Sequence, residues 1–104
     1  MENFVKSCKA MGDGTRFKIL SMLLQKSFCV NAIARQLEIS QSAVSQHMRV
    51  LREAGLVESD KQGYFVHYSI SPQGIEQFRQ DVERLFAPAE GDCDCCPDNG
   101  DKCC

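Results

Sequence analysis

The sequence predicts a mainly α-helical domain that carries one small β-hairpin. Between residues 2 and 56 apolar side chains recur every three or four positions, which is the period of helices that bury one face. From residue 57 to residue 70 the period changes to two, with β-branched and aromatic residues alternating with polar ones. The helical period returns after residue 71.

Length and composition fit one small globular domain. The chain has 104 residues, of which 43% are hydrophobic and 25% are charged, and these are ordinary values for a soluble protein. No apolar run approaches the ~20 residues of a membrane span, and residues 1–9 lack the apolar core of a signal peptide. We therefore expect a cytoplasmic protein with no membrane partner.

The charge of the chain is unevenly distributed. Residues 88–104 contain five acidic residues and one lysine, which gives this segment a net charge of −4. Since the whole chain carries −2, residues 1–87 carry +2. A weakly basic body with an acidic tail is compatible with a nucleic-acid partner.

The first two predicted helices precede the segment that carries the function. Glu2–Met11 has the apolar spacing of a short helix, and Cys8 lies on or near its apolar side, which predicts a buried structural thiol. Asp13 lies between two glycines and can cap a second helix, Thr15–Gln25. We expect that helix to pack through four apolar residues: Phe17, Leu20, Leu23 and Leu24.

A helix-turn-helix pattern follows. A third helix is expected over Asn31–Leu37, and Ser40 is a good N-cap for the next helix, which Gly55 ends. The apolar stripe of this next helix and the residue after it is Val44, Met48, Leu51 and Leu56. Two short helices joined by a tight turn, the second apolar inside and polar outside, are typical of DNA-binding domains in which the second helix enters the major groove.

The outer face of the second of these helices carries side chains that can contact DNA. Glutamine hydrogen-bonds adenine, arginine binds guanine or phosphate, and serine binds either bases or phosphate. The candidate DNA-contacting residues of this helix are Gln41, Ser42, Ser45, Gln46, Arg49 and Arg52. A polar helix face is usually only solvated, so the neighbouring segments decide between the two interpretations.

The segment after Gly55 predicts a wing, that is, a β-hairpin beside the recognition helix. Its strands are expected over 57–61 and 64–70. Gly63 lies in the turn, where glycine can adopt a positive φ at little energetic cost. Lys61 at the tip could contact a phosphate, although a solvated turn lysine is an equally good interpretation. With this wing the predicted architecture is a winged helix-turn-helix.

The last predicted helix has the pattern of a helix that packs on another helix. Ser71 is its expected N-cap and Pro72 occupies its first position. Its apolar residues alternate in steps of three and four: Ile75, Phe78, Val82 and Leu85. In so small a domain we expect this helix to pair with a second subunit, so a symmetric dimer would contact two half-sites about 34–36 Å apart.

Five of the seven cysteines lie in residues 88–104, a segment rich in Gly, Pro, Asp and Asn that cannot build a core. They are Cys93, Cys95, Cys96, Cys103 and Cys104. Because nothing marks the chain for secretion, clustered thiols favour soft-metal binding or redox sensing over structural disulfides. The last 37 residues contain no histidine, and an all-sulfur set favours thiophilic ions such as arsenite or antimonite. The sequence therefore predicts a domain over 1–87 and a flexible metalloid-binding tail over 88–104.

Three stretches together resemble one known family. They are DGTRFKILSML in the second helix, ISQSAVSQHMRVLREAGLV in the recognition segment and QGYFVHYSI in the wing. Over residues 4–87 the sequence is similar to the arsenic- and metal-responsive winged-helix repressors of the ArsR/SmtB family. The resemblance implies a homodimer that represses its own resistance operon and leaves the operator when the inducing ion binds. It also implies that five residues lie in or beside the major groove: Ser42, Ser45, Gln46, His47 and Arg49. His47 borders the apolar side of its helix, so a half-buried imidazole is the alternative.

Two ion sites of that family are incomplete in this chain. Its arsenic sensors often carry a C-V-C motif before the recognition helix, where this chain has Cys29-Val30-Asn31. Its zinc sensors use aspartate and histidine in the last helix, and residues 72–86 contain no histidine. Other members place an adjacent cysteine pair and a third thiol just beyond the last helix. By that resemblance the inducer site is expected at Cys95, Cys96 and Cys103, with Cys104 as the substitute for the third thiol.

The resulting hypothesis is a repressor, not an enzyme, that binds double-stranded operator DNA as a homodimer. Its inducer would be As(III), with Sb(III) as a second candidate, and it would need no organic cofactor. Three alternatives stay open: a redox- or persulfide-sensing repressor of the same fold, a cadmium or lead sensor, and a thiol carrier or redox enzyme that does not bind DNA. A Cys95–Cys96 disulfide ring would be strained. Lys102 is the only sequence-local basic partner for the tail thiols, which disfavours the enzyme.

Overall fold

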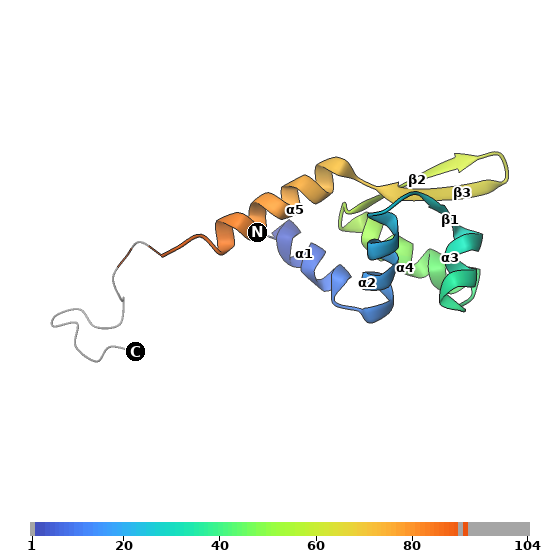
Figure 1. The fold of residues 1–104 in the computed structure, drawn as a ribbon, viewed down its shortest axis with the longest axis horizontal. Helices are drawn as coiled ribbons and strands as arrows, with labels where there is room; N and C mark the ends of the chain where they lie inside the picture. Colours follow the sequence, from blue (N-terminus) through green and yellow to red (C-terminus); the bar gives the residue numbers. More distant parts are fainter. Residues whose placement is uncertain (1, 90, 92–104) are drawn as a thin grey trace.

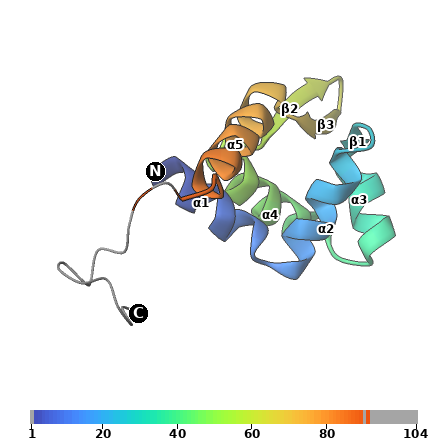
Figure 2. The same ribbon diagram turned by 60° about the vertical axis from the view of Figure 1, so that its left-hand side comes forward.

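The computed structural model describes residues 2–89 and residue 91, so the predicted tail lies almost entirely outside the described residues. Within them, helices and strands follow in the order expected for a winged helix-turn-helix (Figure 1). The elements are α1 (Glu2–Met11), α2 (Gly14–Leu23), β1 (Phe28–Cys29), α3 (Val30–Leu37), α4 (Gln41–Glu53), β2 (Val57–Gln62), β3 (Phe65–Ile70) and α5 (Pro72–Leu85). The hairpin and α5 extend along one side of the molecule, and α1 to α4 pack together beside them (Figures 1 and 2).

The sheet has the strand order β1-β3-β2, and both pairings are antiparallel. The β2–β3 hairpin runs in register from Val57 opposite Ile70 to Gln62 opposite Phe65. The sequence predicted the hairpin but not β1, because a strand of two residues is too short to show a period. This strand joins the start of α3 to the base of the wing, since Phe28 lies opposite Tyr68.

The core lies between α2, α3, α4 and the base of the hairpin. Its largest fully buried side chains come from these three helices and from the residue just before β2: Ile19, Ile33, Val44, Met48, Leu51 and Leu56. The apolar stripe predicted for the recognition helix and the residue after it is therefore confirmed. This burial fixes the rotation of α4 about its own axis, because a helix whose stripe is buried has only one face left for solvent.

The predicted packing face of α2 was wrong in part. Leu20 and Leu23 are buried as expected, but the side chains of Phe17 and Leu24 are 56% and 59% exposed. Ile19, which was not included in the predicted stripe, is completely buried. The helix is apolar on most of its circumference, and the neighbouring helices select the face that carries Ile19.

The prediction of a buried Cys8 was also wrong. The residues of α1 that face the core are Ser7 and Ala10, and the Ser7 hydroxyl donates to the carbonyl oxygen of Ala54 at 3.4 Å. Cys8 follows Ser7 by one position, about 100° further around the helix, and its thiol is exposed. Burial of α1 thus depends on two small residues that allow close approach to α4, not on the thiol.

Helix α5 begins as predicted, with the Ser71 hydroxyl accepting from the backbone N–H of Gly74 at 3.2 Å. Phe78 stacks on Phe4 of α1 with ring centroids 5.2 Å apart. No residue of α5 is fully buried, and beyond its middle the helix projects away from the body (Figure 1). Its C-terminal end therefore leaves Leu85 and the following Phe86 in solvent, 52% and 76% exposed.

Candidate DNA-binding surface

The turn between α3 and α4 is built by local hydrogen bonds. Glu38 ends α3 in the left-handed conformation with φ 57°, and the N–H of Ile39 donates to the carbonyl oxygen of Ala34 at 3.1 Å. Ser40 then caps α4, because its hydroxyl accepts from the N–H of Ala43 at 3.0 Å. The N-terminus of α4, with its partial positive charge, is thereby held at one defined position.

The outer face of α4 is polar and open to solvent. All six residues proposed for it from the sequence are exposed: Gln41, Ser42, Ser45, Gln46, Arg49 and Arg52. The helix contributes Val44, Met48 and Leu51 to the core, so this outer face is the one it can offer to a partner. The structure thus brings the six predicted residues together on one surface, while their contacts with DNA stay a prediction.

The two arginines of this surface are held differently. The Arg52 guanidinium donates to the Ser59 hydroxyl of β2 at 2.9 Å and so links the recognition helix to the wing. The guanidinium of Arg49 lies 3.7 Å from the carboxylate of Glu53, and both side chains are more than half exposed. An exposed pair of this kind contributes little, about 0–1 kcal/mol, so Arg49 is free to exchange Glu53 for a phosphate.

His47 lies at the edge of this surface and is turned towards α2. Its Nδ1 atom is 4.0 Å from Oδ2 of Asp13, and its side chain is 25% exposed. Asp13 is the N-cap of α2, and its carboxylate accepts from the N–H of Arg16 at 3.0 Å. The half-buried imidazole that the sequence offered as an alternative is what the structure describes, and a base contact by His47 stays a prediction.

The backbone N–H of Arg16 lowers the pKa of the Asp13 carboxyl below its usual range, and the charges of Arg16 and His47 lower it further. A carboxyl whose pKa is lowered in the folded state stabilises the fold above its ordinary pKa of about 3.9 and loses that contribution as the pH falls. We therefore expect part of the acid sensitivity of the domain to come from Asp13.

Replacement of Asp13 by asparagine should remove this part of the pH dependence, because asparagine still caps a helix but does not titrate. The expected result is that the variant is less stable than the wild type near neutral pH and that the difference narrows towards about pH 3. Urea unfolding followed by circular dichroism at several pH values measures it. A difference that stays constant with pH would show that the Asp13 charge does not contribute.

Only some of the exposed residues at the tip of the wing were predicted from the sequence. Gly63 has the expected positive φ, 65°, and Lys61 is exposed, as a phosphate contact would require. Beside them Tyr64 is fully exposed and Phe65 is 53% exposed. The period of two in the sequence could have predicted that Phe65 is exposed, since Phe65 alternates with the residues of β3 whose side chains face inward.

The described residues contain no group of three or more His, Cys, Asp or Glu side chains that could hold a metal ion. Cys29 is half-buried at the start of α3, with valine and asparagine after it. The predicted inducer ligands lie outside the described part of the chain: Cys95, Cys96, Cys103 and Cys104.

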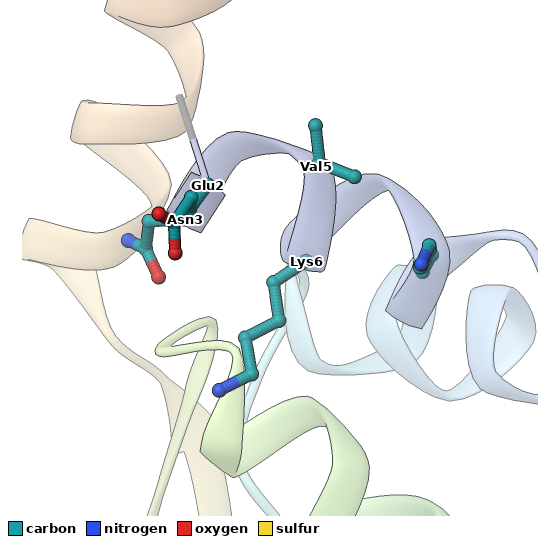
Figure 3. A pocket seen from close by; sticks show the side chains of 5 residues that line it. Glu2, Asn3, Val5 and Lys6 are labelled. Atoms are coloured by element: carbon teal, nitrogen blue, oxygen red, sulfur yellow. The ribbon is translucent and has the colours of Figure 1, made fainter.

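A surface hollow along α1 is lined by residues of that helix alone, among them Lys6 and Lys9 (Figure 3). In residues 2–89 no helix is long and apolar enough to cross a bilayer.

The comparisons with known proteins find relatives among bacterial transcriptional regulators. The family model described as "Bacterial regulatory protein, arsR family" matches residues 13–59, from the cap of α2 to the first strand of the wing. The transcriptional activator HlyU of Vibrio cholerae is 38% identical over 81 residues, which are 78% of this chain and 75% of the relative. The chain belongs to the ArsR family.

Solved structures of ArsR-type regulators share the fold. The structure of HlyU from Vibrio cholerae superposes with a TM-score of 0.68 at 36% identity, covering 84% of this chain and 95% of that one. The arsenical resistance operon repressor of Escherichia coli is 40% identical over 65 residues, which are 62% of this chain and 56% of the relative. The resemblance noted in the sequence is thus confirmed at the level of the family. As an ArsR-family member the chain is a winged helix-turn-helix transcriptional regulator, and such regulators bind DNA and are not enzymes.

Proposed function

We propose that this ArsR-family regulator is a homodimeric repressor that lays α4 of each subunit in successive major grooves of its operator. The observation that carries the proposal is the outer face of α4, which is polar, uncovered and held in one orientation by its buried stripe. Glutamine and serine side chains would contact bases, and Arg49, Arg52 and Lys61 would contact phosphates on either side.

The dimer is supported by the C-terminal half of α5. Leu85 and Phe86 are exposed apolar residues at the end of a helix that has no fully buried side chain. A second copy of the helix would remove this surface from water, with a gain of roughly 25 cal/mol per Å² of apolar area. The position of α5 at the edge of the body leaves both recognition helices free.

The proposed inducer is As(III), with Sb(III) as a second candidate, bound by the thiolates of Cys95, Cys96 and Cys103. Support comes from the sequence, which follows α5 with five cysteines and no histidine, and soft thiolates prefer thiophilic ions. The relationship to the Escherichia coli arsenical resistance operon repressor adds support for As(III) as the inducer. Cys104 is the substitute if one of the three thiols is not used.

Binding would act through α5, whose C-terminal end is followed directly by the tail. Three thiolates bound to one ion would order the tail beside α5, the helix proposed to form the dimer interface. This would bias the relative orientation of the two α4 helices. Allosteric couplings are typically about 1–3 kcal/mol, and full release of a tight repressor needs several. Because linkage is reciprocal, operator DNA must weaken arsenite binding by the same factor.

Fluorescence anisotropy of the reduced protein on its own promoter DNA, titrated with arsenite and in parallel with cadmium and peroxide, tests the proposal. We expect salt-dependent binding and release at nearly stoichiometric arsenite, with weaker arsenite binding to the DNA-bound protein. Release by peroxide but not by arsenite would replace the inducer with a redox signal. Absence of salt-dependent binding would overturn the repressor itself.

A further inference from the structure

Helix α5 starts directly against the turn that ends α4. Gly55 closes α4 with φ 82°, and the N–H groups of Gly55 and Leu56 donate back to the carbonyl oxygens of Arg52 and Leu51. The carbonyl oxygen of Leu56 in turn accepts from the N–H of Ser71, the N-cap of α5, at 3.0 Å. The end of the recognition helix and the start of α5 are thus connected by backbone hydrogen bonding.

A second contact, between two glycines, brings these backbones still closer. A Cβ atom added to Gly74, in the first turn of α5, would overlap the carbonyl oxygen of Gly55 and lie 2.9 Å from its carbonyl carbon. Backbone atoms cannot rotate away as the end of a side chain can, so the two elements would have to separate. By contrast, a Cβ on Gly14, in the first turn of α2, would meet nothing within 4 Å.

Glycine in a helix is less favourable than alanine, yet Gly74 is found where only glycine fits. The other described packing of α5, the stacking of Phe78 on Phe4 and the contact of Ile75 and Phe78 with the core, is made by side chains that can adjust. The angle between α4 and α5 is therefore set by two backbone contacts, that of Gly74 with Gly55 and that of the Ser71 N–H with the carbonyl oxygen of Leu56, which together we call the glycine joint.

We propose that Gly74 is a positioning residue that, through the glycine joint, sets the half-site spacing the dimer can bind. The inference rests on the proposed dimer through α5 and adds the residue that determines its geometry. Helix α4 has 13 residues and is about 20 Å long, so a tilt of about 10° at the joint displaces its far end by roughly 3.4 Å. That displacement equals the rise of one base pair, so a small change at Gly74 changes which operator fits both subunits.

The test is Gly74→Ala, measured by anisotropy on duplexes whose two half-sites are moved closer or farther apart by one or two base pairs. We expect the preferred spacing to shift, affinity at the native spacing to fall about tenfold or more, and affinity for a single half-site to stay within about twofold. Gly14→Ala is the matched control, and it should leave the spacing profile unchanged.

An unchanged profile for Gly74→Ala, or an equal loss at every spacing and on the single half-site, would overturn the inference. If circular dichroism shows that Gly74→Ala does not fold, Ser71→Pro is compared with Ser71→Ala on the same duplexes. Both variants lose the cap of α5, but only proline also removes the N–H that donates to Leu56, so only Ser71→Pro should shift the profile. If it does not, the inference fails. A wild type that binds without any preferred spacing would instead disprove the proposed dimer.

Discussion

Replacement of Arg49 by glutamate is expected to weaken operator binding by about thirtyfold or more, since a lost arginine contact costs roughly 1–3 kcal/mol and a dimer contains two. The Arg49 side chain is 75% exposed on the outer face of α4, and its guanidinium lies 3.7 Å from the carboxylate of Glu53. The variant removes two cations and adds two anions close to phosphates. The plot of log affinity against log salt should therefore lose about two units of slope.

Lys9→Glu provides the control for charge. It changes the net charge by the same amount on α1, where the exposed lysine lies outside the proposed surface. We expect this variant to retain the affinity within a few-fold and to keep the salt slope. Equal losses for the two variants would show that Arg49 acts through the overall charge, and an unaffected Arg49→Glu would mean that α4 does not approach DNA.

Simultaneous replacement of Cys95, Cys96 and Cys103 by serine is expected to abolish release by arsenite while operator affinity stays within about twofold. A serine hydroxyl is nearly the same size as a thiol, but it is not deprotonated at neutral pH and is a hard ligand, so the three soft donors are lost. Arsenite titration of the DNA-bound variant by anisotropy measures the release. Arsenite binding to the free protein measures the site independently of DNA.

The two cysteines outside the tail supply the matching controls. Cys8 is exposed on α1 and Cys29 is half-buried before α3, and neither belongs to the proposed site. Serine at either position should leave the arsenite response intact. Loss of the response in Cys29→Ser would add Cys29 of the partner subunit to the site. Release that persists after Cys104 is replaced together with the other three would move the site away from the tail.

The local signals in the sequence were sufficient for the recognition helix. Three features of this helix were predicted and are present: the Ser40 cap, the buried stripe that includes Val44 and Met48, and the end of the helix at Gly55, which has a positive φ. Each of these depends on residues within one or two turns of one another. Helix and strand ends were predicted within one or two residues for the same reason.

Features that depend on distant segments could not be predicted in this way. Helix α2 has apolar residues on most of its circumference, so the sequence could not show that the other helices bury Ile19 and leave Phe17 exposed. His47 and Asp13 are 34 positions apart in the sequence, and Gly74 and Gly55 are 19 positions apart. No local sequence pattern predicts either contact. The polar surface could thus be predicted, but the contacts that hold it could not.

The strand order β1-β3-β2 has a consequence for the behaviour of the wing in concentrated solution. It leaves β2 with a neighbour on one side only among the described strands, and unpaired strand edges invite pairing with a second chain. Beyond Val57 every residue of β2 is exposed, and Glu58, Asp60 and Lys61 place charges along it. Charged side chains on an edge disfavour the addition of another strand. The protein can therefore extend a long hairpin towards a partner without offering an aggregation site.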